Sequence, residues 1–173
     1  MSLFELAIPT ILRHEGGFVN DSADPGGATN FGVSLRWLKS QGMLGDLDHD
    51  GDVDQADIKA LTKDAAAEFY HKFWWDAYQY GMISAQAVAT KVFDMAVNMG
   101  ASRAHKIFQG ALGVPQDGVL GRVTFTAANA SLSLDLLTRM QNRQVAFYHG
   151  LVASNPSMEK FLNGWLNRAY DRN

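Results

Sequence analysis

The sequence contains no cysteine, which excludes disulfides and thiolate metal sites from the fold. It has no apolar run long enough to span a membrane, so we expect no stable membrane insertion. Residues 1–11 lack a basic flank, a long apolar core and a small-residue cleavage site, which predicts synthesis in the cytoplasm without a signal peptide. No histidine has a partner at the spacing of a zinc site.

The sequence also lacks a strong excess of positive or negative charge. The 173 residues are 47% hydrophobic and 19% charged, with a formal net charge of −3, which is an ordinary globular composition. Without a dense basic stripe, nucleic acid is excluded as a partner. Residues 1–101 hold 7 Lys and Arg against 14 Asp and Glu, whereas residues 102–173 hold 8 against 4. The basic C-terminal part suits an anionic polymer, with scattered solvated charge as the alternative.

One glutamate closes an apolar segment near the N-terminus. On a helix, the Glu15 carboxyl continues the stripe formed by Phe4, Ile8 and Ile11, so it should be partly buried. The glycine pair that follows can end the helix, which places Glu15 in the last turn, at the negative end of the dipole. Both effects favour the protonated carboxyl that a glycosidase uses to protonate a leaving oxygen. Pro9 predicts a kink, or a helix that starts near it.

Two further polar residues follow in a turn-rich stretch. Asp24 lies in Asp-Pro-Gly-Gly, and Thr29 opens Thr-Asn-Phe-Gly-Val, which predicts a small β-hairpin near residues 18–33. A carboxylate and a hydroxyl facing an acid could hold and deprotonate a water molecule. Each residue taken singly also has a purely structural interpretation. Glu15 fits a helix end, Asp24 fits a turn, and Thr29 fits a strand. Their combination in a glycine-rich stretch favours a hydrolytic site.

Glu-Gly-Gly-Phe at residues 15–18 and Asp-Pro-Gly-Gly-Ala-Thr-Asn-Phe-Gly-Val at residues 24–33 resemble the signature of glycoside hydrolase family 108. The resemblance implies a lysozyme-like α-helical fold and an N-acetylmuramidase that cleaves peptidoglycan between N-acetylmuramic acid and N-acetylglucosamine, with Glu15 as the catalytic acid. By analogy with phage-type lysozymes, Asp24 and Thr29 would position the water, or Asn30 would replace Thr29. Such an enzyme acts in the periplasm or cell wall, and would need a holin or a secretion route to reach it.

The acidic stretch at residues 46–57 has the layout of an EF-hand calcium loop. Acids stand at positions 1, 3, 5, 7, 9 and 12, with glycine at position 6 and an aliphatic residue at position 8. We predict a structural Ca²⁺ there and no cofactor for catalysis, with a solvated acidic loop as the alternative. The expected ligands are Asp46, Asp48, Asp50, Asp52 through its carbonyl, and Asp57.

An aromatic stretch follows the acidic loop. Apolar spacing predicts a helix from Thr62 that runs into residues 73–80, where the aromatic residues are too many for one core face. Some of them should therefore be exposed or line a groove, where aromatic faces suit sugar rings. The expected substrate contacts are Asn30, Phe31, Trp75, Tyr78 and Asn98.

The remaining helices are predicted at residues 34–41 with Ser34 as N-cap, 85–99, 103–112 with Ser102 as N-cap, 133–153 and 156–171. The string Asp-Gly-Val-Leu-Gly-Arg-Val-Thr at residues 117–124 resembles the peptidoglycan-binding segment found C-terminal in family 108 muramidases.

The sequence therefore predicts a mainly α-helical monomer that binds peptidoglycan. We place a catalytic lobe at residues 1–90 and a helical peptidoglycan-binding lobe at residues 91–173, packed as one compact unit. The family 108 members implied are phage endolysins or secretion-associated muramidases. Two alternatives remain: a non-catalytic wall-binding or secretion-accessory protein on the same fold, and a calcium-responsive interaction module based on residues 46–57.

Overall fold

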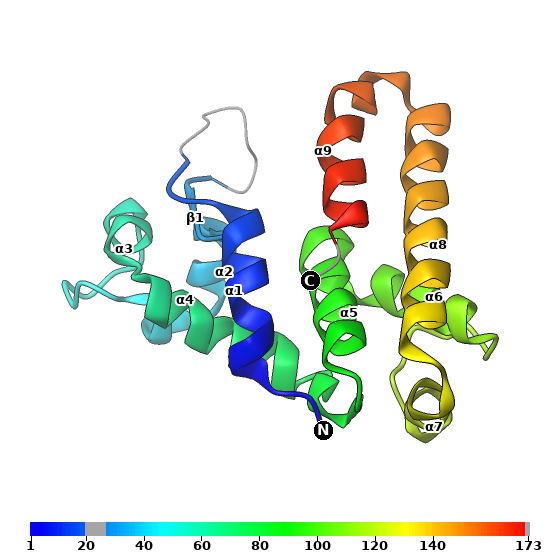
Figure 1. The fold of residues 1–173 in the computed structure, drawn as a ribbon. Coiled ribbons are helices and arrows are strands. Elements are labelled where there is room, and N and C mark those ends of the chain that lie inside the picture. Colours follow the sequence, from blue (N-terminus) through cyan, green and yellow to red (C-terminus); the bar gives the residue numbers. More distant parts are fainter. Residues whose placement is uncertain (20–26, 172–173) are drawn as a thin grey trace. The chain divides into compact units, whose positions relative to one another are not determined.

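The computed structural model describes residues 1–19 and 27–171 (Figure 1). Helix makes up 71% of the structure, and the described residues add one small antiparallel hairpin, which confirms the predicted mainly α class. The α-helices are α1 (Phe4–Glu15), α2 (Leu35–Ser40), α3 (Gln55–Ala60), α4 (Lys63–Tyr70), α5 (Gln86–Met99), α6 (Ala101–Leu112), α7 (Arg122–Ala130), α8 (Ser133–Ser154) and α9 (Glu159–Tyr170). None of the helices in these ranges is long and apolar enough to cross a membrane.

The chain divides into two units. One, here called the hairpin unit, is Ile11–Phe73; the other, the helical unit, joins Met1–Thr10 to Trp74–Asn173. The lobe boundary predicted at residue 90 falls inside α5 and stays a prediction.

The hairpin unit contains the only strands in the described ranges, β1 (Thr29–Asn30) and β2 (Val33–Ser34). Asn30 pairs with Val33, and an isolated bridge joins Val19 to Thr29, which confirms the hairpin predicted near residues 18–33. The residues between the strands, Phe31 and Gly32, have φ angles of 48° and 77°. Positive φ at both central residues is typical of a two-residue type I′ turn.

Helix ends in this unit follow local chemistry. The helix α1 ends at Glu15 as predicted, because Gly16 takes the left-handed conformation with φ 70°. It continues through Pro9. Ser34 caps α2 as predicted, since its side chain accepts a 3.2 Å hydrogen bond from the Trp37 N–H.

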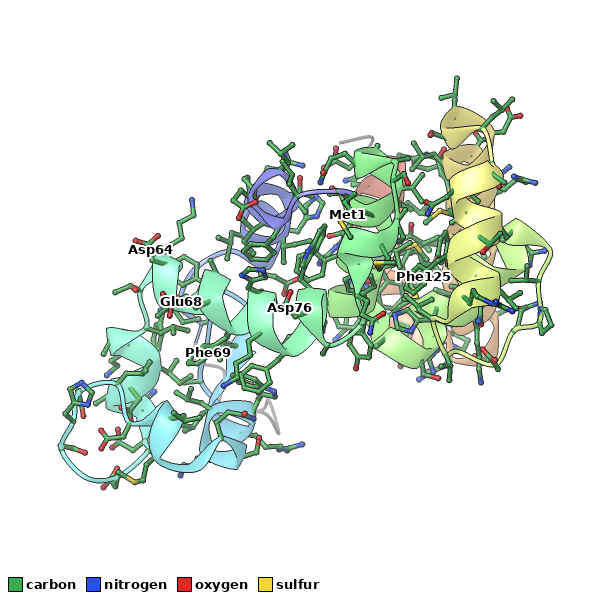
Figure 2. The ribbon with its side chains drawn as sticks, turned by 90° about the horizontal axis from the view of Figure 1, so that it is seen from below. Met1, Asp64, Glu68, Phe69, Asp76 and Phe125 are labelled. Atoms are coloured by element: carbon green, nitrogen blue, oxygen red, sulfur yellow. The ribbon has the colours of Figure 1, made fainter. Side chains whose placement is uncertain are left out.

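The helix α4 presents one face to the core and one to solvent. Ala66 and Tyr70, one turn apart, are buried, whereas Asp64 and Glu68 lie one turn apart on the exposed face (Figure 2). The chain then leaves α-helical geometry for a π-helix, η2 (His71–Asp76). The sequence prediction of one regular helix through this stretch is therefore wrong from residue 71 onward.

The helical unit is organised around α5, which is buried nearly all round. Within the unit α8 and α9 lie side by side (Figure 1). Asp94 on α5 is fully buried, and Arg168 on α9 forms an ion pair with it at 2.9 Å. Lys91 donates hydrogen bonds to the carbonyls of Arg168 and Ala169, which lie in the last turn of α9. These polar contacts attach α9 to the buried helix.

The predicted N-cap of α6, Ser102, is wrong by two residues. The helix begins at Ala101 after Gly100, so Ser102 lies inside it. The helix ends at Leu112, as predicted, because Gly113 takes the left-handed conformation with φ 76°. Within α6, the buried Gln109 side chain donates to the Asp117 carboxylate at 2.6 Å and accepts from the Gly118 N–H at 2.8 Å. This network orders the start of the loop at residues 117–124.

Candidate active site and acidic loop

Glu15 is the last residue of α1 and lies in the hairpin unit. Its side chain is half-buried, as the apolar stripe predicted. Its position in the last turn places the carboxyl at the negative end of the helix dipole. Glu15 is therefore held on a regular element, with one part of the side chain against protein and the other accessible to solvent.

The turn of the hairpin lies directly against this carboxyl. A Cβ atom placed on Gly32 would stand only 2.7 Å from Glu15 Oε2 and 2.8 Å from Glu15 Cγ, and it would overlap the Tyr70 hydroxyl. A side chain at this position would therefore push both groups away. Gly32 is needed for its positive φ and also for the close approach of the backbone to Glu15.

Tyr70 joins α4 to the same turn. Its hydroxyl donates a 2.9 Å hydrogen bond to the carbonyl of Phe31, and its ring is buried with 2% exposure. Tyr70 is not among the site residues predicted from the sequence, because it lies on the apolar face of its helix. The available signal was its hydroxyl, which needs a partner when the ring is buried. Glu15, Tyr70 and the Phe31–Gly32 turn thus form one cluster, which we call the glutamate cluster.

The predicted water-positioning residues are placed only in part. Thr29 stands on β1, is half-buried, and donates a 3.4 Å hydrogen bond from its hydroxyl to the Gly27 carbonyl. Its backbone pairs with Val19, so the residue is anchored close in sequence to the turn at Glu15. Asp24 lies outside the described residues, and its role stays a prediction.

Asn30 is buried within the fold, and its predicted contact with sugar stays a prediction. It is 6% exposed, and its side-chain nitrogen donates to the carbonyls of Ile58 at 3.0 Å and Leu61 at 3.3 Å. Both donor hydrogens are therefore used within the fold, at the C-terminal end of α3. The neighbouring Phe31 is half-buried, and its predicted contact with substrate stays a prediction.

Trp75 is largely buried, and its predicted contact with substrate stays a prediction. The ring is 5% exposed and makes edge contacts with Phe4, Tyr80 and Phe93 in the core of the helical unit. Trp75 lies within the π-helix η2, whose wider turn changes which side chains face inward. The burial of this ring therefore does not follow from a regular 3.6-residue period.

The other two predicted contacts also belong to the helical unit. Tyr78 is half-buried, packs edge-on against His105, and lines a cavity of about 470 Å³ together with Arg103 and Lys106. The Asn98 carboxamide oxygen accepts a 2.6 Å hydrogen bond from the Tyr148 hydroxyl. Both roles in substrate binding stay predictions.

The acidic loop lies in the hairpin unit and gathers its carboxylates in two groups. Asp46, Asp48 and Asp50 each offer an oxygen within 4.8 Å of the others, and Asp52, Asp54 and Asp57 form a second group by the same measure. Five of these six aspartates are the residues predicted as calcium ligands, and the sixth is Asp54. Asp46 and Asp57 are buried and the other four are exposed, and these two groups could bind a metal ion.

Asp46 differs from a solvated surface acid. The residue is 7% exposed, and its Oδ2 accepts a 3.1 Å hydrogen bond from the Gly51 N–H, across the sharp turn of the loop. Its Oδ1 is buried and has no hydrogen-bond partner among the described residues. A buried carboxylate oxygen without a donor is costly unless a cation neutralises it. This oxygen is the observation that points from an acidic loop to a metal site.

Asp57 ties the loop to the helix that follows it. One of its oxygens accepts from Leu47 N–H at 2.6 Å and Asp48 N–H at 3.2 Å, and the other accepts from Asp54 N–H at 2.7 Å. Desolvation alone would raise the pKa of Asp57, but these backbone donors outweigh it and lower the pKa. Asp57 is therefore held as an anion by the backbone, whatever metal ligand it also provides.

The outer carboxylates repel one another. Partial desolvation and the charge of Asp50 raise the pKa of Asp48, and the charge of Asp50 is the main cause that raises the pKa of Asp52. Like charges at this spacing disfavour the ionised form. A divalent cation at the loop would relieve this repulsion.

Residues 8–100 match the model of the family described as glycosyl hydrolase 108, and residues 103–170 match that of a predicted peptidoglycan domain. Among solved structures, the chain is similar to SagA of Brucella abortus. The two share 31% sequence identity, the match covers 96% of this chain and 88% of that one, and the TM-score is 0.74. No curated protein matches the sequence. Both the glutamate cluster and the acidic loop lie within the first matched range.

Proposed function

Because the chain belongs to the glycosyl hydrolase 108 family and is a glycoside hydrolase, we propose that it is an N-acetylmuramidase whose general acid is Glu15. The scissile bond in this proposal joins N-acetylmuramic acid to N-acetylglucosamine in the glycan strand of peptidoglycan. The observation that carries the proposal is the glutamate cluster, in which a half-buried carboxyl at the end of a helix lies against a strained turn.

The geometry of the cluster suits proton donation. A general acid must keep one orientation while the glycosidic oxygen takes its proton. Gly32 limits the space on one side of the Glu15 carboxyl, and Tyr70 fixes the turn that carries Gly32. Strained backbone at such a turn is retained where the surrounding structure requires it, and functional sites are common examples.

The water that completes hydrolysis needs a second group. We propose that Asp24 directs this water with help from Thr29, which stands on β1 next to the turn. If the two carboxyls are far enough apart to admit a water between them, the reaction inverts the anomeric configuration. The stereochemistry of the product reports which arrangement applies.

Peptidoglycan as the ligand is supported by the second half of the chain. Residues 103–170 match a predicted peptidoglycan domain, and residues 102–173 carry 8 Lys and Arg against 4 Asp and Glu. Positive charge attracts an anionic polymer and raises its local concentration. In this proposal the C-terminal part retains the wall while the hairpin unit cleaves it.

We also propose that residues 46–57 hold a structural Ca²⁺. Oxygen ligands suit this hard cation, and the buried Oδ1 of Asp46 supplies one that has no other partner among the described residues. The ion would neutralise the repelling carboxylates and take no part in bond cleavage.

The identity of the cleaved bond tests the proposal. Purified peptidoglycan is digested with wild type, the new reducing ends are reduced with borohydride, and the sugars are identified after acid hydrolysis. Reduced N-acetylmuramic acid in excess supports a muramidase, whereas reduced N-acetylglucosamine in excess assigns the other glycosidic bond. Wall binding without any new reducing end would instead indicate the non-catalytic wall-binding protein.

A further inference from the structure

We propose that calcium binding at residues 46–57 activates hydrolysis by positioning the hairpin beside Glu15, and that Asn30 transmits this effect. The inference rests on the proposed calcium site and on the proposed role of Glu15. It assigns to Asn30 the function of a positioning residue. All the contacts that carry it lie within the hairpin unit, Ile11–Phe73.

The first step joins the acidic loop to α3. Asp54, in the loop, caps α3 by accepting from the Ala56 N–H, and Asp57, in the first turn of α3, accepts from the Asp54 N–H. Asp57 also accepts from Leu47 and Asp48 at the opposite end of the loop. The two ends of the loop and the start of α3 are therefore one hydrogen-bonded piece, and a change in the loop must reach the helix.

The second step joins α3 to the hairpin. The helix has only six residues, too few to be stable without support from its surroundings. Its C-terminal end is fixed by the buried Ile58 and Leu61, whose carbonyls both accept from the Asn30 side chain. Asn30 crosses 28 and 31 residues of sequence to make these bonds. The position of β1 thus depends on the position of α3.

The third step joins the hairpin to Glu15. Asn30 pairs with Val33 across the turn, and the two residues between them are Phe31 and Gly32. The Phe31 carbonyl accepts from Tyr70, and Gly32 lies against the Glu15 carboxyl with no room for a side chain. A shift of β1 therefore moves the surface against which Glu15 is oriented.

Charge supplies the driving force. Six carboxylates fall within residues 46–57, and no lysine or arginine lies among them. Without a cation their repulsion opens the loop and loosens α3. Asn30 then loses its anchor, the hydrogen bonds to the carbonyls of Ile58 and Leu61. With Ca²⁺ the loop closes around the ion and the anchor is restored. Couplings of this kind usually change a binding or activity by five- to 150-fold, so we expect calcium to activate hydrolysis by about tenfold.

The experiment measures reducing-sugar release by the metal-depleted full chain, with CaCl₂ added to saturation and with MgCl₂ as the comparison cation. Three variants accompany wild type. Asp46→Asn removes a ligand charge, Asn30→Ala removes the link, and Asp64→Asn is the matched control, an exposed aspartate on α4 outside the loop. Melting temperature and calcium affinity are measured on the same samples.

The proposal expects CaCl₂ to raise the maximal rate of wild type and of Asp64→Asn about tenfold, with little change in the half-saturating wall concentration. Asp46→Asn should lose the activation. Asn30→Ala should still bind calcium and gain melting temperature from it, yet its rate should be low and independent of calcium. If Asn30 were merely structural, Asn30→Ala would lower stability, but calcium would still raise its rate by the same factor as in wild type. That result would overturn the proposal. Calcium that stabilises wild type without changing its rate would overturn it too.

Hydrogen exchange on wild type decides the matter if Asn30→Ala does not fold. Calcium should increase protection at residues 28–35 together with residues 46–61. Protection confined to residues 46–61 would contradict the coupling. Since this readout needs no activity, it separates the two proposals: no sugar release at any calcium concentration refutes the hydrolase site, while the exchange data still report whether loop and hairpin are linked.

Discussion

The hydroxyl of Tyr70 donates a 2.9 Å hydrogen bond to the carbonyl of Phe31, 39 residues earlier in the chain. This bond fixes the turn whose second residue, Gly32, lies against the carboxyl of Glu15. Tyr70, which the helical pattern assigns to the core, therefore also helps to hold the turn that lies against Glu15, the candidate general acid.

Replacing Tyr70 with phenylalanine tests that support. The ring keeps its packing, but the Phe31 carbonyl loses a donor, which should lower the free energy of unfolding by about 1 kcal/mol. Misplacement of the turn should reduce the rate of sugar release by about tenfold. Denaturant unfolding and rate measurements on the same preparation separate the two effects. A rate equal to wild type would show that the turn needs no anchor from α4.

Two glycines with the same kind of backbone give a matched pair. Gly32 and Gly42 have φ angles of 77° and 61°, but a Cβ on Gly42 meets nothing within 4 Å. Alanine at either position should cost about 1–2 kcal/mol because of the positive φ. Only Gly32→Ala should also displace Glu15 and reduce the rate by about 100-fold. Equal rates in the two folded variants would contradict the close approach at Gly32.

The pH dependence of stability should report on His105. Its Nδ1 lies 3.0 Å from the Gly118 carbonyl, which can only accept, so Nδ1 carries the proton and Nε2 accepts from the Tyr80 hydroxyl at 2.9 Å. Burial lowers the pKa of His105, although the bond to Gly118 partly opposes this. The unfolded chain takes up this proton near pH 6.5, before the folded chain does.

The free energy of unfolding should therefore be highest above pH 6.5 and fall as the pH decreases through the folded pKa of His105. Melting temperatures of wild type, His105→Gln and the exposed control His149→Gln, measured from neutral to mildly acid pH, test this. The decrease in melting temperature on acidification should be smaller in His105→Gln than in wild type, and it should be unchanged in His149→Gln. If the melting temperature of His105→Gln decreases as much as that of wild type, groups other than His105 cause the pH dependence.

Helix ends and the hairpin could be predicted from sequence because their causes are local. Gly16 and Gly113 end helices by taking positive φ, and Ser34 caps α2 with its own side chain. These choices depend on a few adjacent residues. The same holds for the partial burial of Glu15, which follows from helical spacing.

The residues that support the candidate site could not be predicted in this way. The bonds of Asn30 and Tyr70 join segments 28 to 39 residues apart, and a local pattern carries no record of such partners. The burial of Trp75 could not be predicted for a different reason, since a π-helix breaks the 3.6-residue period of the preceding helix. Phe31 takes a positive φ that a non-glycine residue rarely adopts.

The most direct test of the central claim compares sugar release from peptidoglycan by wild type, Glu15→Gln and Glu5→Gln. Glu5 is an exposed glutamate in the first turn of the same helix, so it controls for the change of charge on α1. If Glu15 is the general acid, Glu15→Gln should fold and bind the wall but release no sugar above background, while Glu5→Gln should match wild type. A folded Glu15→Gln variant that still cleaves the glycan would contradict the account.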